Sequence, residues 1–493
     1  MGRRWRWLTV LACVAIGGCV AGPNFEPSAP PETSNYGAHT AAVTVATPSV
    51  AGGEAQRFVS GADLAGDWWT LFHSRRLDAL IDEALADNHD LKAAKAALLA
   101  AHEQVLAQRG AYFPTVGASF GASRQQQTGV LAPPLNSNAL EYSLFTPQVS
   151  VSYVPDVFGL NRRSVESAQA QADAARYQMI ATDLTLTTNV ANAYIQEAAL
   201  EDQIDATRQV IEIDGKLVEA LKYQLEKGYA SGLDLAAQQT QLAQTAAGLP
   251  PLVKQAEQQR DLIAVLTGRY PDQSTEEPAS LAALTLPGDL PLSLPSTLVS
   301  QRPDVLQAEA NQHAASAQIG IAAANRLPNV ELTANLGSTA LTLGEVFGSG
   351  AGFWGLAATI AEPIFDGGTL LHRERAAKST YVQASEQYRS TVLTALQNVA
   401  DTLAALDQDA RTLKATAAAA DAAKVTLDLS ERQWKDGYAS YLSLLSAEQV
   451  YQQARIGFVQ AEASRYADTV ALFQALGGGW WRRSDLSKGD DAH

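Results

Sequence analysis

Side chains that could perform catalysis are few in this sequence, and their spacing matches no catalytic site. The 493 residues include seven histidines and two cysteines. His102-Glu103 lacks the second histidine of a zinc-binding helix, and Asp407 and Asp409 lie two apart, so they face different ways on a helix. The glycines at 477–479 follow a helical pattern rather than a strand, which is typical of a helix stop and not of a phosphate loop. We therefore expect no enzymatic activity, no metal site and no cofactor.

Cys19 is the residue for which the sequence indicates a covalent modification. A basic stretch and an apolar run over 7–16 precede it, as in a secretory signal. The segment 16–19 resembles a bacterial lipobox, which implies a signal peptide over 1–18 and acyl chains on the sulfur and amine of Cys19. More than one chain is needed for lasting membrane attachment. Val20, in place of an aspartate, implies sorting to the outer membrane. The alternative is an ordinary signal cut nearby, with Cys19 as a plain thiol.

The rest of the chain consists of two copies of one pattern. The segment Gly228–Ser231 recurs 209 positions later at Gly437–Ser440. We place the two copies at 77–268 and 296–477, joined by a Pro-rich linker over 269–295. A lipidated tail over 19–76 precedes them, and a C-terminal tail over 478–493 follows. Because Pro, Ser and Thr are frequent up to about residue 66, we expect that part to run along the surface without a core of its own.

Both copies predict the same order of elements. A helix of about 30 residues comes first, then two strands, a very long helix, a glycine turn and a returning helix of about 35 residues. The strands are expected over 112–123 and 145–157 in the first copy, and over 328–340 and 352–364 in the second. The very long helices are expected over 161–227 and 369–436.

Apolar and polar residues alternate along the four predicted strands. Val116, Ala118 and Phe120, for example, alternate with small or polar residues. Each run is about 10 residues long, which suits a tilted strand that crosses hydrocarbon. The alternative is a soluble sandwich with one wet face, and a secreted, lipidated chain makes that less favourable.

The long helices carry a seven-residue apolar repeat, which predicts a left-handed coiled-coil seam. At 1.5 Å per residue each helix would extend about 100 Å, more than a globular domain needs. We expect Gly228 and Gly437 to end these helices as C-terminal caps. Pro250-Pro251 predicts a kink or break in the returning helix of the first copy only. The repeated positions are Ile204, Ile211, Val218 and Leu225 in the first helix, and Leu406, Leu413, Leu427 and Trp434 in the second.

Four membrane strands per chain are too few to close a barrel. An open sheet edge in lipid leaves backbone N–H and C=O groups unpaired, at several kcal/mol each, so chains must share a barrel. Two chains would give eight strands, and three would give twelve, enough for a lumen. The expected fold class is thus α plus membrane β-barrel, with the long helices forming a periplasmic tunnel. The formal charge of −16 argues against a nucleic-acid partner held by charge.

These features resemble the TolC-type outer-membrane factors of tripartite efflux pumps, in particular their lipoprotein branch. The resemblance covers nearly the whole mature chain, and Arg302-Pro303-Asp304-Val305 is its most specific internal motif. The other matching segments are Cys19–Pro27, Trp68–Ile81, Ser231–Leu235, Ile319-Gly320, Leu327-Pro328 and Leu476–Trp481.

The resemblance implies a homotrimer with a twelve-stranded barrel in outer-membrane lipid and a tunnel that is closed at its periplasmic tip. It also implies docking to a periplasmic adaptor (membrane fusion) protein and, through it, to an inner-membrane efflux pump. The tip would lie at the turns that contain Gly228 and Gly437.

Residues near the tip depart from the family pattern. In the family, aspartates just past the second turn form a constriction ring, with an aromatic residue before it. Ser443 and Ser446 occupy the matching positions here, and Trp434 takes the aromatic place, so a charged gate is in doubt. Asp234 in the first turn keeps a carboxylate. Two roles remain open for it: part of the gate, or a first-turn residue favoured by the helix dipole.

Three functions fit the pattern. The first, which we favour, is a passive outer-membrane exit duct for drugs or other small amphiphilic compounds. The second is a duct for type I protein secretion or for metal-ion efflux. The third is a non-conducting lipoprotein scaffold in the envelope, which would not need lipid-facing strands.

Overall fold

The computed structural model describes residues 20–33, 35–37, 42–128, 130, 139–273 and 279–487. The signal segment and Cys19 lie outside the described residues. The chain divides into two compact units. The sheet unit comprises Met1–Ser28, Leu98–Ala175 and Ala308–Tyr388, and the helical unit comprises Ala29–Ala97, Arg176–Gln307 and Arg389–His493.

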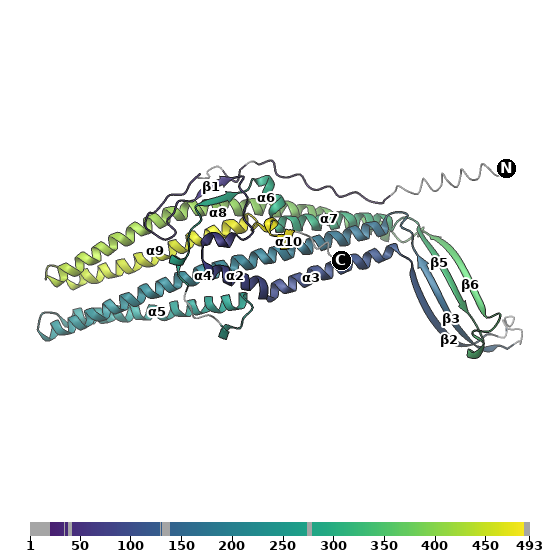
Figure 1. The fold of residues 1–493 in the computed structure, drawn as a ribbon, viewed down its shortest axis with the longest axis horizontal. Helices are drawn as coiled ribbons and strands as arrows, with labels where there is room; N and C mark the ends of the chain where they lie inside the picture. Colours follow the sequence, from purple (N-terminus) through teal and green to yellow (C-terminus); the bar gives the residue numbers. More distant parts are fainter. Residues whose placement is uncertain are drawn as a thin grey trace. The chain divides into compact units, whose positions relative to one another are not determined.

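The sheet unit contains one four-stranded antiparallel sheet in the order β2-β3-β5-β6 (Figure 1). Each copy of the repeat supplies one hairpin, and β3 pairs with β5 between the copies. The first hairpin reaches further into its connecting loop than predicted, since pairing continues to Gln126 and Glu141. Arg124 and Glu141 form an exposed cross-strand ion pair there at 2.9 Å. The strands are β2 (Thr115–Gln126), β3 (Glu141–Tyr153), β5 (Asn329–Ser338) and β6 (Gly352–Ala361).

The register confirms the predicted alternation. Directly opposed residues share one face of an antiparallel sheet. One row across the sheet is therefore apolar, and the next is small or polar. Val116 at 69% and Leu356 at 76% solvent exposure belong to the apolar face, which nothing in this single chain covers among the described residues. The apolar row is Val116, Val151, Ala334 and Leu356, and the neighbouring row is Gly117, Ser150, Asn335 and Gly355.

Two antiparallel helix pairs continue from the hairpins, each closed by a tight turn (Figure 1). The long helices α4 (Leu160–Glu226) and α8 (Thr369–Lys435) have 67 residues each. The returning helices α5 (Gly232–Leu266) and α9 (Tyr441–Ala475) have 35 residues each. None of the helices in the described part of the chain has the length and apolar character needed to cross a membrane.

Both long helices begin in the same way. The Asp156 carboxylate accepts from the backbone N–H groups of Asn161 and Arg162 at 2.8 and 2.9 Å. Asp366 accepts in the same way from Gly368 and Leu370 at 2.8 and 2.7 Å. Each aspartate satisfies N–H groups that the first helical turn cannot bond internally.

The seven-residue repeat follows the buried side of both long helices along most of the stretch in which it occurs. Ile204 and Val218 on α4, and Leu406 and Leu413 on α8, are at most 5% exposed. Leu225, the last member on α4, is 37% exposed next to the turn. The seam therefore loosens toward the turn.

The first helix of each copy is interrupted, contrary to the prediction of one helix of about 30 residues. Asn88 caps the second segment by accepting from Leu91 N–H at 2.9 Å, and its amide donates to the Leu266 carbonyl at 3.0 Å. Arg302 interrupts the first helix of the second copy. It precedes Pro303, and a residue before proline disfavours the helical backbone region. Its ψ of 123° lies outside that region. The segments are α2 (Arg75–Asp87), α3 (His89–Arg109), α6 (Pro295–Gln301) and α7 (Pro303–Ala324).

Of the kink or break predicted at Pro250-Pro251, the break is not found, because α5 continues through both prolines. Apolar residues on either side of the pair pack against Leu200 and Ile204 of α4. This packing compensates for the two N–H groups that proline lacks. The flanking residues are Leu249, Leu252 and Val253.

Part of the N-terminal tail contributes to the core of the helical unit, where the sequence predicted none. β1 (Arg57–Ser60) pairs in parallel with β4 (Asp289–Leu292) of the linker. Arg465 of α9 is fully buried and donates to the Gly52 and Glu54 carbonyls at 3.3 and 3.0 Å, which draws the tail backbone inward. The remaining short elements are α10 (Ser484–Ser487) and 3₁₀ turns at Trp68–Phe72, Gly110–Tyr112, Pro271–Gln273, Leu281–Ala283, Leu343–Glu345 and Trp480–Arg482.

Candidate functional site

The two glycine turns have the same backbone geometry. Gly228 and Gly437 adopt φ of 78° and 81°, the left-handed region that favours glycine. In the first turn, Gly228 N–H donates to the Leu225 carbonyl at 3.0 Å, and Tyr229 N–H donates to the Gln224 carbonyl at 2.8 Å. This pair of bonds is the Schellman motif, which satisfies carbonyls at a helix C-terminus. The second turn repeats it, with donors Gly437 and Tyr438 and acceptors Trp434 and Gln433.

Asp234 is engaged in capping α5. Its carboxylate accepts from the backbone N–H of Ser231 at 3.1 Å, while the Ser231 hydroxyl accepts from Asp234 N–H at 3.1 Å. This reciprocal capping box stabilises the first turn of the helix. Ser443 is the equivalent residue of the second turn, and its N–H donates to the Ser440 hydroxyl at 3.3 Å. Ser443 and Ser446 are both exposed.

A small apolar core joins the two antiparallel helix pairs next to these turns. Leu217 and Leu221 of α4 pack with Tyr441 and Leu444 of α9. Trp434 packs against this core and meets Tyr441 edge to face, with ring centroids 6.2 Å apart. The aromatic residue predicted at the tip thus holds the two copies together within one chain.

A buried polar network extends this core away from the tip, and the sequence analysis missed it. The Asp214 carboxylate of α4 accepts from Gln238 Nε2 and Thr245 Oγ1 of α5, each at 3.1 Å. Glu448 of α9 is 5% exposed, and neither of its carboxylate oxygens has a hydrogen-bond partner in the described structure. Burial, followed by the nearby Asp214, raises the pKa of Glu448 to about 8.

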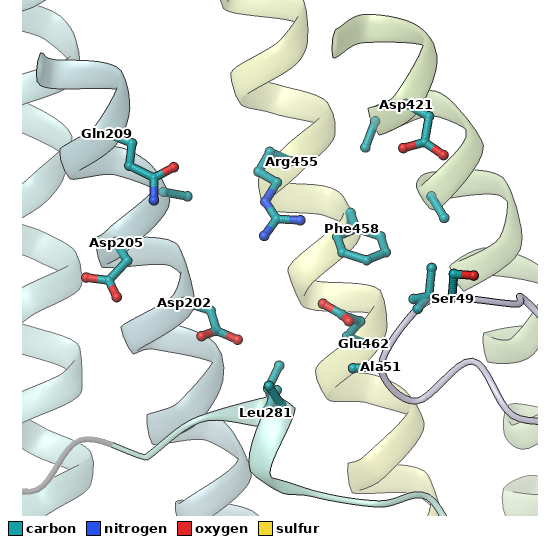
Figure 2. Close-up of a pocket in the computed structure, with 15 residues that line it drawn as sticks. Ser49, Ala51, Asp202, Asp205, Gln209, Leu281, Asp421, Arg455, Phe458 and Glu462 are labelled. Atoms are coloured by element: carbon teal, nitrogen blue, oxygen red, sulfur yellow. The ribbon is translucent and has the colours of Figure 1, made fainter. Parts of the chain in front are cut away.

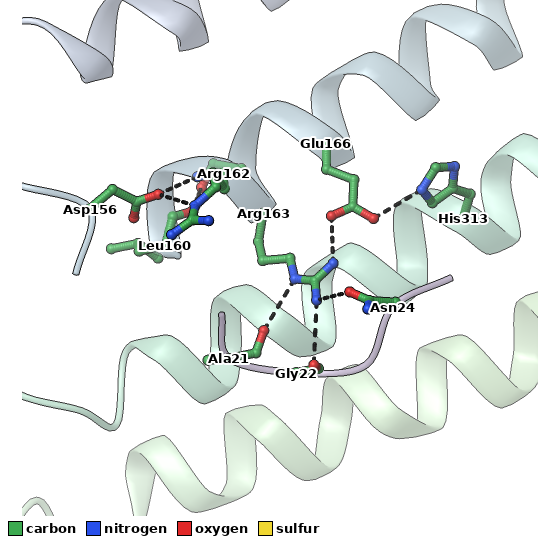
Figure 3. A network of polar contacts seen from close by, with 10 residues as sticks. Ala21, Gly22, Asn24, Asp156, Leu160, Arg162, Arg163, Glu166 and His313 are labelled. Carbon is green, nitrogen blue, oxygen red and sulfur yellow. Dashed lines mark hydrogen bonds and ion pairs between the residues drawn. The ribbon is translucent and has the colours of Figure 1, made fainter. Parts of the chain in front are cut away.

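A socket for the start of the tail lies in the sheet unit (Figure 3). Arg163 is 4% exposed and donates to the Ala21 carbonyl at 3.1 Å and to Asn24 Oδ1 at 2.8 Å. Its guanidinium also pairs with Glu166 at 2.7 Å, and Glu166 in turn contacts His313 Nε2 at 3.0 Å. The ring of Phe25 stacks on His313 with centroids 4.4 Å apart. These contacts hold the residues that directly follow Cys19.

An acidic cavity of about 550 Å³ lies in the helical unit between α4, α8 and α9. Asp202 of α4 lies across it from Arg455 and Glu462 of α9 (Figure 2). Asp205 and Asp421 add two more carboxylates to the lining. Burial raises the pKa of Glu462 to about 7, although the positive charge of Arg455 opposes the shift. In the described part of the chain, no group of three or more His, Cys, Asp or Glu side chains is arranged to hold a metal ion.

Comparison with known proteins gives a consistent result. The sequence profile described as outer membrane efflux protein matches residues 80–269 and 294–478. The probable efflux pump outer membrane protein TtgC of Pseudomonas putida is 30% identical over 95% of this chain and 94% of its own length. The pyoverdine export outer membrane protein OpmQ of the same species is 29% identical over 84% of this chain and 88% of its own. The solved outer-membrane channel OprN superposes with a TM-score of 0.83 at 26% identity, and the match covers 94% of this chain and all of that one.

Proposed function

The chain belongs to the outer membrane efflux protein family, and we propose that three copies of it form one channel with a shared wall. As a member of that family it is the outer-membrane component of an efflux system, and it acts as a channel rather than as an enzyme. Our proposal concerns the trimer, the barrel, the partners and the transported compounds.

The observation that carries the proposal is the open four-stranded sheet. β2 and β6 are its outer strands, and neither has a partner on its outer side among the described residues. One face of the sheet is apolar and suits lipid, while the other is small and polar and suits a lumen. If β6 of one copy pairs with β2 of the next, three copies close a twelve-stranded barrel and no edge remains in the membrane.

The helices form the tunnel of this channel in the periplasm. The turns at Gly228 and Gly437 form its far tip, where a periplasmic adaptor and an inner-membrane pump dock. Tyr229 and Tyr438 support this docking role, because they are 84% and 87% exposed at the two turns. The proposed cargo is a drug or another small amphiphilic compound, and the relative OpmQ is named for the export of pyoverdine.

The gate at the tip has no carboxylate ring just past the second turn. Ser443 and Ser446 are exposed hydroxyls at those positions, and Asp234 acts as a helix cap. Closure then depends on the apolar core around Trp434 and Tyr441. Acyl chains on Cys19 anchor each copy to the outer membrane.

The purified protein in a planar bilayer tests this function. We expect a trimer by mass that gives discrete conductance steps. Leu356→Asp, which places a charge on the apolar face of β6, should prevent membrane insertion, whereas Asn335→Asp on the opposite face should still insert and conduct. If the folded, lipidated protein is monomeric or never conducts, the proposal is refuted. The non-conducting lipoprotein scaffold would then be the function that remains.

A further inference from the structure

Four buried oxygen-bearing side chains meet between the two copies of the repeat, behind the turns of the helical unit. Asp214, Gln238, Thr245 and Glu448 are between 0% and 5% exposed. They come from α4, α5 and α9, so the group spans the seam at which the second copy packs on the first. Gln449 Nε2 of α9 also donates to Gln241 Oε1 of α5 at 3.0 Å across the same seam.

Hydrogen-bond donors are distributed unequally between the two carboxyl groups. Asp214 accepts one bond on each carboxylate oxygen, from Gln238 and from Thr245. Glu448 has no donor for either oxygen in the described structure. The negative charge of Asp214 is one of the causes that raise the pKa of Glu448. Two carboxylates cannot bond without a proton between them, and the donors favour the charged form of Asp214. Because both oxygens of Asp214 already accept a hydrogen bond, we expect the shared proton on Glu448, where it can be donated to Asp214.

Among the described residues, no positively charged group acts on the pKa of Glu448. The charged groups that act on Glu448 are Asp214 of α4 and Glu431 of α8, and both are acidic. Tyr441 of α9 faces the same carboxyl groups and also Asp234 of α5, and burial raises the pKa of its phenol. Its hydroxyl is buried without a hydrogen-bond partner in the described structure. Loss of the shared proton would therefore place two like charges against each other in a buried site.

We propose that Asp214 and Glu448 form a proton-controlled latch that holds α9 against α4 and α5 when protonated and releases it when deprotonated. This latch deepens the proposed channel function, because separation of these helices behind the turns widens the tip. It acts through groups that are distinct from the serines and Asp234 at the turns themselves.

The direction of the pH effect follows from linkage. In the closed seam Glu448 binds its proton with a pKa of about 8, whereas an exposed glutamate has a pKa of 4.5. Between these values the closed state holds a proton that the open state releases. The ratio of closed to open seams therefore falls by up to about tenfold per pH unit across this window. The latch is fully effective at acidic pH and is lost as pH rises through 8.

The experiment measures the distance between the two turns by electron paramagnetic resonance. Spin labels go on the exposed residues of Tyr229→Cys and Tyr438→Cys in a Cys19→Ser background, in the detergent-solubilised assembly, at pH 5, 7 and 9. We expect longer and broader distances as pH rises. Glu448→Gln should keep the short distance at every pH, because the glutamine amide still donates to Asp214. Glu462→Gln removes an equally buried acid from the same helix and should keep the wild-type response.

Two outcomes would overturn the latch. One is a distance that does not change between pH 5 and 9, and the other is a Glu448→Gln variant with the wild-type response. Infrared spectroscopy gives a readout that is independent of conduction, since the protonated-carboxyl absorption at pH 7 should be lower in Glu448→Gln than in wild type by the contribution of one carboxyl group. A protein that fails to conduct, but still shows the infrared difference and the pH-dependent distance, would refute the proposed channel. The latch would not be refuted by that result.

Discussion

Replacing Arg163 by methionine should release the start of the tail from the sheet unit. Methionine keeps much of the side-chain volume but removes all the donors. The guanidinium makes two bonds of good length to the tail, at 3.1 Å to the Ala21 carbonyl and 2.8 Å to Asn24 Oδ1, and a longer one at 3.4 Å to the Gly22 carbonyl. Hydrogen bonds to a charged group contribute about 1.5–3 kcal/mol each, so we expect docking to weaken by about 3–5 kcal/mol.

Hydrogen exchange followed by mass spectrometry measures this release locally. The Ala21 N–H donates to the Phe158 carbonyl at 2.9 Å, so its protection reports on docking. A loss of about 3 kcal/mol or more corresponds to exchange faster by about 100-fold or more in peptides that cover 20–28. Protection of the strands should not change.

The neighbouring residue supplies a matched control. The side chain of Arg162 is 53% exposed and pairs with Asp156 at 3.4 Å, an interaction worth less than about 1 kcal/mol. Arg162→Met should leave the tail docked. Equal protection of Ala21 in Arg163→Met and wild type, or equal release in both variants, would refute the reasoning.

Four further predictions concern other parts of the chain. Leu444→Ala removes a fully buried side chain from the core at the turns, and should lower the free energy of unfolding by about 2–5 kcal/mol in thermal or denaturant unfolding; no change would contradict the packing. Gly228→Ala forces a side chain into positive φ and should cost about 1–2 kcal/mol in the same assay, whereas Gly232→Ala, with open space around it, should be tolerated. Cys19→Ser should abolish incorporation of labelled fatty acid while the protein still conducts, and retained label would refute the lipobox. Because burial raises the pKa of Glu462 from 4.5 to about 7, its neutral form stabilises the fold below 4.5 and this contribution is lost as pH rises to 7; Glu462→Gln should flatten the melting temperature over that range.

Elements with a long regular pattern could be predicted from the sequence. Alternation along Val116–Phe120 and its three counterparts indicated the four strands. The pairing of β3 with β5, which joins the two copies, was not predicted. The seven-residue step through Ile204 and Leu406 indicated the long helices because a sustained repeat has no other common structure. Gly228 and Gly437 could be placed because few residues other than glycine adopt positive φ at a helix end.

Features that depend on contacts between distant segments could not be predicted. β1 and β4 are four residues each, and so short a run has no usable period. The break at Asn88 depends on a bond to Leu266, far along the chain. The Asp214–Glu448 latch did leave a signal, since Asp214 stands three residues after Ile211 at a core position of the seven-residue repeat. A polar residue at such a position usually has a specific partner, but the sequence does not say which.

If the sheet forms the proposed barrel and Cys19 is acylated, the socket for the tail also sets the depth of the sheet in the membrane. Ala21 is tied to the Phe158 carbonyl, and Cys19 stands only two residues before it. An extended chain advances about 3.5 Å per residue, so an acylated Cys19 would reach no more than about 7 Å from that bond. In the proposed channel, the glycerol level of the inner leaflet would then coincide with the junction where β3 ends and α4 begins. Extra residues inserted between Cys19 and Ala21 would uncouple the height of the strands from the lipid surface without altering either one.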